Sequence, residues 1–251
     1  MSEARVTIKL GGIAGAHVAS LEAVARGAPR ATVLVHGGGN EVAEWSRRLG
    51  IEPRTHDGLR VTDPATLEVV VAVLGGLVNT RLVAALRVAG REAVGLTGVD
   101  GGLLRLRRRE PGLGEVGEVV GVDARILDAA IGAEDLPVVA SIGADESGAM
   151  LNVNADEVAG AIAAARGGLL LLCTDVAGVM RDGRLLERIG PDGAEGMLAD
   201  GSASAGMRPK LRAAVLAARA GCTVRIIDGR VGSGMVRALE GDNVGTEVTA
   251  A

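Results

Sequence analysis

The stretch VTIKLGG at residues 6–12 reads as a short buried strand that ends at two glycines. The lysine within it is unusual for this chain. Of the 27 basic side chains, only Lys9 and Lys210 are lysines, and all the others are arginines. A chain that uses arginine almost everywhere has kept lysine at two positions, which suggests that both positions require that side chain.

Patterns typical of strands and helices alternate outward from this stretch. Pro64 follows Asp63 as a helix-start signal, and Asn40 and Asn154 are each expected to cap a helix. The expected strands are 5–10, 31–36, 93–98, 136–143, 169–176, 223–228 and a short one at the end of the chain, with a hairpin around residues 111–114. The expected helices are 17–26, 40–50, 62–90, 124–133, 154–168, 206–221 and 232–242. This alternation predicts an α/β fold, a three-layer α/β/α sandwich around a mainly parallel open sheet.

Composition argues against several classes of protein. Apolar residues make up 48 % and the net charge is −4, with no extended basic face beyond the run 105–110 and no Phe or Tyr to stack on bases, so a nucleic-acid binder is not expected. Neither a signal peptide nor a membrane span is predicted. Cys173 and Cys222 lie in apolar stretches and are expected to be buried thiols of a cytoplasmic protein.

Two expected strands end in glycine clusters, KLGG at 9–12 and VHGGGN at 35–40. Glycine allows the backbone to approach an anion closely, and successive N–H groups can form a concave site for its oxygens. Such clusters can also simply close tight turns. Neither matches a dinucleotide fingerprint or a P-loop.

Five stretches, taken in order, resemble the amino-acid kinase family. They are KLGG at 9–12, VHGGGN at 35–40, GLRVTD at 58–63, NVNAD at 152–156 and GMRPK at 206–210. The resemblance covers the chain from Val6 to its end and is strongest to the members that act on N-acetylglutamate. Asn40 departs from the proline that is usual after HGGG, and the lead-in to Lys210 is looser than the family pattern.

The resemblance implies a single domain, residues 1–251. Its first lobe, about 1–167, would bind an acidic substrate and dimerise, and its second, about 168–251, would bind ATP. The implied reaction transfers the γ-phosphoryl of ATP to the side-chain carboxylate of N-acetyl-L-glutamate, giving N-acetyl-L-glutamyl 5-phosphate in arginine biosynthesis. Mg²⁺ would be bound by the ATP phosphates, without a metal site made by the protein.

The resemblance also assigns roles to residues. Lys9 and Lys210 would neutralise the transferring phosphoryl group, with Asp156 between them. The expected substrate-binding residues are Gly38, Gly39, Arg60 and Asn152. The expected nucleotide- and phosphate-binding residues are Gly11, Gly12, Asp175, Val176, Ala177, Gly178, Val179, Met180, Ser202, Ala203 and Ser204. Because a carboxylate nucleophile is already ionised, His36 and His56 are expected to have structural roles.

Two other functions fit the same motifs. One is the related kinase of lysine biosynthesis, which phosphorylates a carrier-linked α-aminoadipate and which a basic docking surface at 105–109 would favour. The other is a non-catalytic nucleotide-binding sensor. The first strand begins at about Arg5, which leaves no room for the extra N-terminal helix that the resemblance associates with hexamers, so a homodimer is expected, with the apolar segment 67–78 facing the partner.

Overall fold

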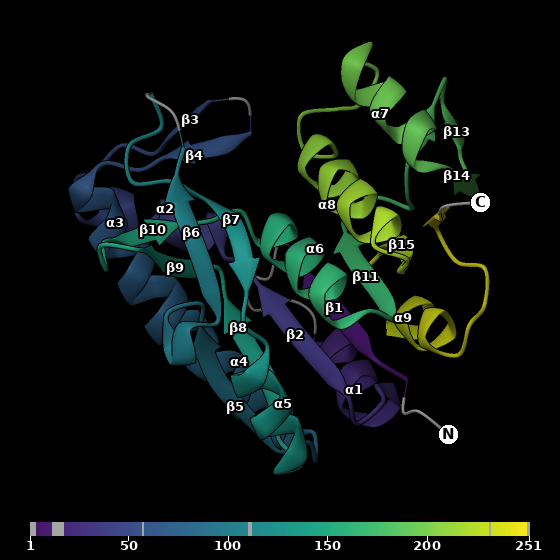
Figure 1. The fold of residues 1–251 in the computed structure, drawn as a ribbon, viewed down its shortest axis with the longest axis horizontal. Helices are drawn as coiled ribbons and strands as arrows, with labels where there is room; N and C mark the ends of the chain where they lie inside the picture. The colour runs from purple at the N-terminus through teal and green to yellow at the C-terminus, as the bar shows by residue number, and fades with distance from the viewer. Residues whose placement is uncertain (1–3, 12–17, 57, 110–111, 231, 250–251) are drawn as a thin grey trace.

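The computed structural model describes residues 4–11, 18–56, 58–109, 112–230 and 232–249. Within these, eight strands form one sheet in the order β14-β16-β15-β11-β1-β2-β8-β5 (Figure 1). Their bounds are β1 Val6–Leu10, β2 Thr32–His36, β5 Ala93–Thr97, β8 Leu136–Ala140, β11 Leu169–Thr174, β14 Arg188–Ile189, β15 Thr223–Asp228 and β16 Thr246–Val248. All neighbouring pairs are parallel except β15 with β16. The predicted mainly parallel sheet is thus confirmed.

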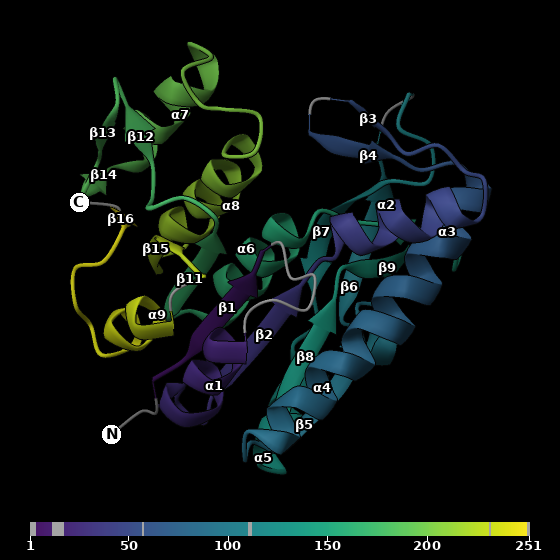
Figure 2. The same ribbon diagram turned by 180° about the vertical axis from the view of Figure 1, so that it is seen from behind.

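Alternate residues of the central strands enter two separate hydrophobic cores. On β2, Val33 and Val35 belong to one core and Leu34 to the other, and β11 divides its leucines in the same way. Helices cover both faces, as the two opposite views show (Figures 1 and 2). The first core receives α5 Arg125–Gly132, α6 Ala155–Arg166, α7 Pro191–Ala199 and α8 Arg208–Arg219. The second receives α1 Val18–Gly27, α2 Gly39–Arg48, the long helix at 64–88 and α9 Gly232–Leu239.

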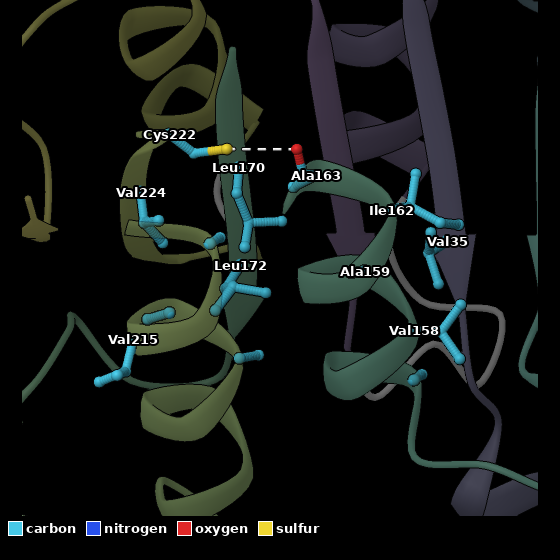
Figure 3. Close-up of a cluster of buried hydrophobic side chains, with 14 of the residues drawn as sticks. Val35, Val158, Ala159, Ile162, Ala163, Leu170, Leu172, Val215, Cys222 and Val224 are labelled. Atoms are coloured by element: carbon cyan, nitrogen blue, oxygen red, sulfur yellow. Dashed lines mark hydrogen bonds between the residues drawn. The ribbon is translucent and has the colours of Figure 1, made fainter. Parts of the chain in front are cut away.

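Helix α6 is central to the first core. Val158 and Ile162 point toward Val35 of β2, while Leu170 and Leu172 of β11 lie on its other side (Figure 3). Gly160 of α6 is so close to Ala213 of α8 that a Cβ there would lie 2.9 Å from the Ala213 carbonyl oxygen. The two helices therefore pack with their backbones almost in contact, which holds their N-terminal ends at a defined separation.

A long helix lies on the other face. It consists of α3 Pro64–Val70, a π-helical segment η1 Val71–Val78 and α4 Asn79–Val88. Its buried side chains include Val73, Leu74 and Leu82, which pack in the second core. By length and composition alone it is apolar enough to cross a membrane, and it is the one such helix in the described part of the chain. Its packing against the sheet accounts for the apolar residues on its buried face.

Smaller elements surround the carboxyl ends of the central strands. A second sheet has the order β10-β9-β6-β7, with β6 Leu104–Arg108, β7 Gly117–Val122, β9 Ile142–Asp145 and β10 Met150–Asn152. A short 3₁₀ helix, η2 Asp100–Gly102, precedes it. The hairpin β3 Arg54–His56 and β4 Leu59–Val61 stands at the same end of the molecule as α7 and α8 (Figure 2). A further small hairpin pairs β12 Met180–Arg181 with β13 Arg184–Leu185.

Several expectations need correction. The predicted strand 136–143 is divided into β8 and β9, which belong to different sheets. Asn40 does not cap α2, because the N-cap is Gly38 and Asn40 lies inside the first turn. In contrast, Asn154 caps α6, and Asp63 caps the helix that begins at Pro64, as expected. The hairpin predicted around 111–114 is confirmed as β6–β7. Its pairing with β9 and β10 in a second sheet, the hairpin β3–β4 and helix α7 were not predicted, because the other strands are short and α7 is rich in glycine and acidic residues.

Candidate active site

Three elements bring the two lysines of the chain to one carboxylate. Lys9 is the next-to-last residue of β1, Asp156 lies in the first turn of α6, and Lys210 lies in the first turn of α8. The Nζ atom of Lys9 is 2.9 Å from Oδ1 of Asp156, and Nζ of Lys210 is 3.3 Å from Oδ2. The side chains are only 9 %, 6 % and 12 % exposed for Lys9, Asp156 and Lys210, so this is a largely desolvated cluster. The structure brings together the three residues expected to be catalytic.

The local sequence explains the position of Asp156. Asn154 caps α6 by accepting hydrogen bonds from the backbone N–H groups of Asp156, at 2.9 Å, and Glu157, at 3.2 Å. The positive end of the helix dipole favours an acidic side chain in this turn. Glu157 in turn accepts a hydrogen bond from the Val119 backbone N–H and pairs with Arg109, which ties the start of α6 to the hairpin β6–β7.

Asp156 remains ionised despite its burial. Burial is the largest influence and would raise the pKa of this carboxyl group. The charges of Lys9 and Lys210, together with their hydrogen bonds, outweigh it and bring the pKa below the ordinary value for aspartate. One negative and two positive charges therefore share the site, which carries a surplus positive charge suited to an anionic ligand.

A pocket of about 520 Å³ opens beside this cluster. Charged residues among its described lining are Lys9, Arg47, Arg60 and Asp156, three cations and one carboxylate. The rest of its polar lining includes Asn40, Ser141, Asn152 and the backbone of Gly37, Gly38 and Gly39. Apolar side chains such as Leu59 and Val116 complete the wall. The pocket therefore fits a small molecule with more than one negative charge.

Arg60 is held in place from one side only. Its Nη2 donates a 2.7 Å hydrogen bond to the carbonyl oxygen of Gly39, while its Nη1 is buried and has no hydrogen-bond partner among the described residues. Burial, followed by the positive charge of Arg47, lowers the pKa of this guanidinium, which nevertheless stays protonated. A buried donor beside a second cation points to a carboxylate as the missing partner.

A chain of two hydrogen bonds links Asn152 to the backbone of Arg60. The Asn152 side chain donates a 3.1 Å hydrogen bond to the hydroxyl of Thr62, which donates to the Arg60 carbonyl oxygen at 3.0 Å. The substrate-binding residues expected from the sequence, Gly38, Gly39, Arg60 and Asn152, all line the pocket.

Close packing requires glycine at two positions in the turns after β1 and β2, Gly11 and Gly38. A Cβ atom at Gly11 would lie 2.6 Å from the Cys173 carbonyl oxygen and 3.3 Å from the Lys9 Nζ. A Cβ at Gly38 would lie 2.7 Å from a methyl carbon of Leu74. Because Gly38 is also the N-cap of α2 and has no side chain, the first N–H groups of that helix have no side-chain cap. Gly12 lies outside the described residues.

The residues expected to bind the nucleotide occupy two loops away from this pocket. Asp175, Val176, Ala177 and Met180, after β11, are exposed, whereas Gly178 and Val179 turn inward, where the Val179 N–H donates to the Thr246 hydroxyl at 2.8 Å. Before α8, Ser202 and Ser204 are exposed and Ala203 is buried. None of these residues lines the 520 Å³ pocket. Their role as a nucleotide site stays a prediction.

The described residues offer no cluster of side chains for a metal ion, and both cysteines are buried. Among the described residues, no group of three or more His, Cys, Asp or Glu side chains could hold a metal ion. Cys173 is buried at the end of β11, and burial raises the pKa of its thiol to about 12, so it is not a nucleophile at neutral pH. Cys222 is also a buried free thiol.

The chain is similar to known proteins over most of its length. The model of the amino acid kinase family matches residues 5–228. The chain belongs to the amino-acid kinase family. It is 47 % identical over 208 residues to the acetylglutamate kinase of Methanopyrus kandleri, covering 78 % of this chain and 85 % of that protein. It is 44 % identical over 245 residues to that of Rubrobacter xylanophilus, covering 97 % and 96 %.

This amino-acid kinase also resembles solved structures along its whole length. The crystal structure of smu.665 from Streptococcus mutans UA159 superposes with a TM-score of 0.82 at 28 % identity, covering 98 % of each chain. The predicted family and fold class are therefore confirmed, and the strand order and the two helical layers described above belong to a known architecture.

Sequence reasoning missed two residues of this site. Arg47 lies seven residues after Asn40 on α2, and this helical spacing would have placed both on one face. Thr62 is completely buried and joins Arg60 to Asn152, yet it lies in a stretch expected to act through Arg60 alone. The helix spacing was a usable signal for Arg47, whereas nothing in the sequence indicated the pairing of Thr62 with Asn152.

We expect Asp156→Asn to lower the free energy of unfolding by about 3 kcal/mol or more, because it leaves two buried ammonium groups without a counter-ion. Urea denaturation would measure this. The exposed Asp192→Asn, which also removes a partner of a basic residue, should have little effect.

The stabilisation by Asp156 should depend on pH. Because the pKa of Asp156 is lowered, its contribution to the free energy of unfolding is fully present above about pH 4 and is lost as the pH falls through the lowered value. The difference between wild type and Asp156→Asn should therefore shrink in acid, and a constant difference would contradict the ion-pair account.

Proposed function

We propose that this amino-acid kinase transfers the γ-phosphoryl group of ATP to the side-chain carboxylate of N-acetyl-L-glutamate. The products are N-acetyl-L-glutamyl 5-phosphate and ADP, a step of arginine biosynthesis. The observation that carries the substrate assignment is the charge of the pocket. Three cations face it, and its one described carboxylate, Asp156, is already shared by two lysines.

This charge pattern favours a dicarboxylate without a free amine. One carboxylate would approach Lys9 and the glycine turn, and the other would bind the free Nη1 of Arg60 with Arg47 nearby. A free ammonium group would meet two guanidinium groups, and the one carboxylate among the described lining residues, Asp156, already pairs with two lysines. Acetylation removes that charge, so N-acetylglutamate fits better than glutamate.

The reaction needs positioning and charge neutralisation more than proton transfer. The attacking carboxylate is ionised at neutral pH, so no general base is required. Lys9, at the end of β1, would contact the transferring phosphoryl group from the substrate side, and Lys210 would contact it from the ATP side. Asp156 touches both lysines and would hold them in position while charge moves from ATP to the acceptor. The N–H groups of Gly38 and Gly39 would donate to the phosphoryl oxygens.

The nucleotide would lie over the carboxyl ends of β11 and β15. We propose that the segments 175–180 and 202–204, together with Gly11 and Gly12, form its site, with the exposed members in contact with ATP and the buried Val179 and Ala203 supporting the loops. Mg²⁺ would enter with ATP and offset charge on the phosphates. This assignment divides the chain near residue 167 into a substrate lobe and an ATP lobe. The cytoplasm, where ATP is available, is the proposed location.

The rival function, on a carrier-linked aminoadipate, would be favoured by a free basic surface at 105–109. The arginines of this run are largely neutralised instead. Arg107 pairs with Glu118, Arg108 with Glu115, and Arg109 with Glu157. This hairpin therefore does not present the positive docking surface that the rival requires. The intact Lys9–Asp156–Lys210 cluster likewise argues against a non-catalytic sensor.

A coupled ADP-release assay with matched acceptors tests the substrate assignment. We expect kcat/KM for N-acetyl-L-glutamate to exceed that for L-glutamate by about 100-fold or more, because the free ammonium must be desolvated beside two guanidinium groups. N-acetyl-L-aspartate is the control for the distance between the two carboxylates, because it keeps both carboxylates and the acetyl group but is one methylene shorter. Faster turnover of glutamate or of a carrier-linked aminoadipate would show the assignment to be wrong.

We further propose that the enzyme is a homodimer that associates through the long helix. Its outer face carries the small exposed residues Ala72, Gly76 and Ala84 and ends at Val88, which is 91 % exposed. Small side chains on an apolar, exposed helix face permit close approach of a second helix.

The mass of the protein in solution tests this assembly. We expect light scattering to give twice the mass of one chain for the wild type and the mass of one chain for Ala72→Arg. Leu49→Arg, at another exposed site, should leave the mass unchanged, and a monomeric or hexameric wild type would contradict this assembly.

A further inference from the structure

His36 ends β2 immediately before the glycine turn and is completely buried. Both of its ring nitrogens have partners. Nδ1 lies 2.9 Å from the carbonyl oxygen of Gly37, and Nε2 lies 3.0 Å from Nδ2 of Asn79, the first residue of α4. The reaction proposed above does not use this ring as an acid or a base, so its burial beside the site calls for another role.

The surroundings of Asn79 determine where the histidine proton lies. The amide nitrogen of Asn79 also faces the carbonyl oxygens of Val138, at 2.9 Å, and Leu96, at 3.4 Å. Carbonyl oxygens only accept hydrogen bonds, so this side of the Asn79 amide must be the NH₂ group. Nε2 of His36 must therefore be the acceptor, and the ring proton lies on Nδ1, where it is donated to Gly37. Burial lowers the pKa of His36 to about 4, so the ring stays neutral near pH 7.

The hydrogen bond from His36 Nδ1 to the Gly37 carbonyl oxygen also determines the direction of the Gly38 N–H. The carbonyl of Gly37 and the N–H of Gly38 belong to one planar trans peptide group and point in opposite directions. When the ring fixes the carbonyl on the core side, the Gly38 N–H must point away from it. Gly37 and Gly38 both line the 520 Å³ pocket, and a Cβ atom at Gly38 would lie 2.7 Å from a methyl carbon of Leu74, so Leu74 leaves no room for a side chain there.

We propose that His36 is a positioning residue: its Nδ1–H, held in one tautomer by Asn79, turns the Gly37–Gly38 peptide so that the Gly38 N–H faces the phosphoryl group being transferred. Asn79 reaches the adjacent strands β2, β8 and β5 at once, so the orientation of the peptide is set by the sheet itself. This inference rests on the proposed phosphoryl transfer, because it gives the Gly38 N–H a role only in that reaction.

Two substitutions of His36 test the roles of its two ring nitrogens separately. The side-chain amide nitrogen of asparagine has the position of Nδ1, so His36→Asn keeps the donor to Gly37 and loses the link to Asn79. The amide oxygen of glutamine reaches the position of Nε2, so His36→Gln keeps the acceptor for Asn79 and loses the donor to Gly37. Both substitutions remove one buried hydrogen bond, so we expect similar decreases in thermal stability.

Steady-state kinetics with ATP and N-acetyl-L-glutamate should distinguish the two variants. We expect kcat of His36→Gln to fall about 10-fold or more with smaller changes in KM, because a misdirected N–H loses part of the 10²–10³-fold effect of one preorganised donor. His36→Asn should stay within about 3-fold of wild type by the same reasoning. Equal kcat values in the two variants, or a larger loss in His36→Asn, would overturn the proposal. An inactive wild type would instead refute the proposed function.

A measurement on the wild-type protein keeps the proposal testable if either variant fails to fold. The chain has three histidines, so ¹⁵N-labelled histidine spectra can be assigned by substituting the other two. At pH 7 we expect His36 to show a protonated Nδ1 and an unprotonated Nε2. A ring protonated on Nε2, alone or together with Nδ1, would overturn the proposal, because Asn79 would then face a donor.

Discussion

The arrangement of the site depends on one carboxylate shared by two buried lysines. Asp156 lies within 3.3 Å of both Lys9 and Lys210, and these three residues come from β1, α6 and α8. Two ammonium groups would not stay together in a desolvated site without this anion. Because the carboxylate also needs both lysines to stay ionised, each of the three elements is held in register by the other two.

The rest of the fold supports this cluster at fixed distances. The Asn154 cap begins α6 where Asp156 can reach both lysines, and the contact between Gly160 and Ala213 fixes α8 against α6. The glycine turn after β2 brings backbone N–H groups to the end of the sheet where the parallel strands terminate, beside Lys9 of β1. Arg60 lines the same pocket as Lys9 and Asp156 and donates a hydrogen bond to Gly39 in the glycine turn after β2. The candidate site therefore combines groups from both ends of the chain.

Much of this arrangement was predictable from the sequence because strong local signals coincide. The layers were predictable from the apolar strands, the glycine turns and the helix caps at Asp63 and Asn154. The two lysines were recognisable as candidate site residues because the chain contains no others. Other features depend on tertiary contacts that no local pattern encodes. Asn40 is a good cap by type, but α2 begins at Gly39 with Gly38 as its N-cap, where a Cβ atom would lie only 2.7 Å from Leu74 of a distant helix. The acidic partners of Arg107, Arg108 and Arg109 could not be predicted, because they depend on how the hairpin β6–β7 and the start of α6 pack together.

The central claim is that both positions need a compact ammonium group, which can enter between crowded phosphoryl oxygens where a planar guanidinium cannot. The most direct measurement is the kcat of Lys9→Arg, Lys210→Arg and the double variant, with folding checked by circular dichroism. Each single variant should fold and lose about 100-fold in kcat, with less change in KM. The double variant should lose less than the product of the two, because both lysines act on one phosphoryl group through Asp156. Near-normal kcat in both single variants would show that charge alone suffices and would contradict the account.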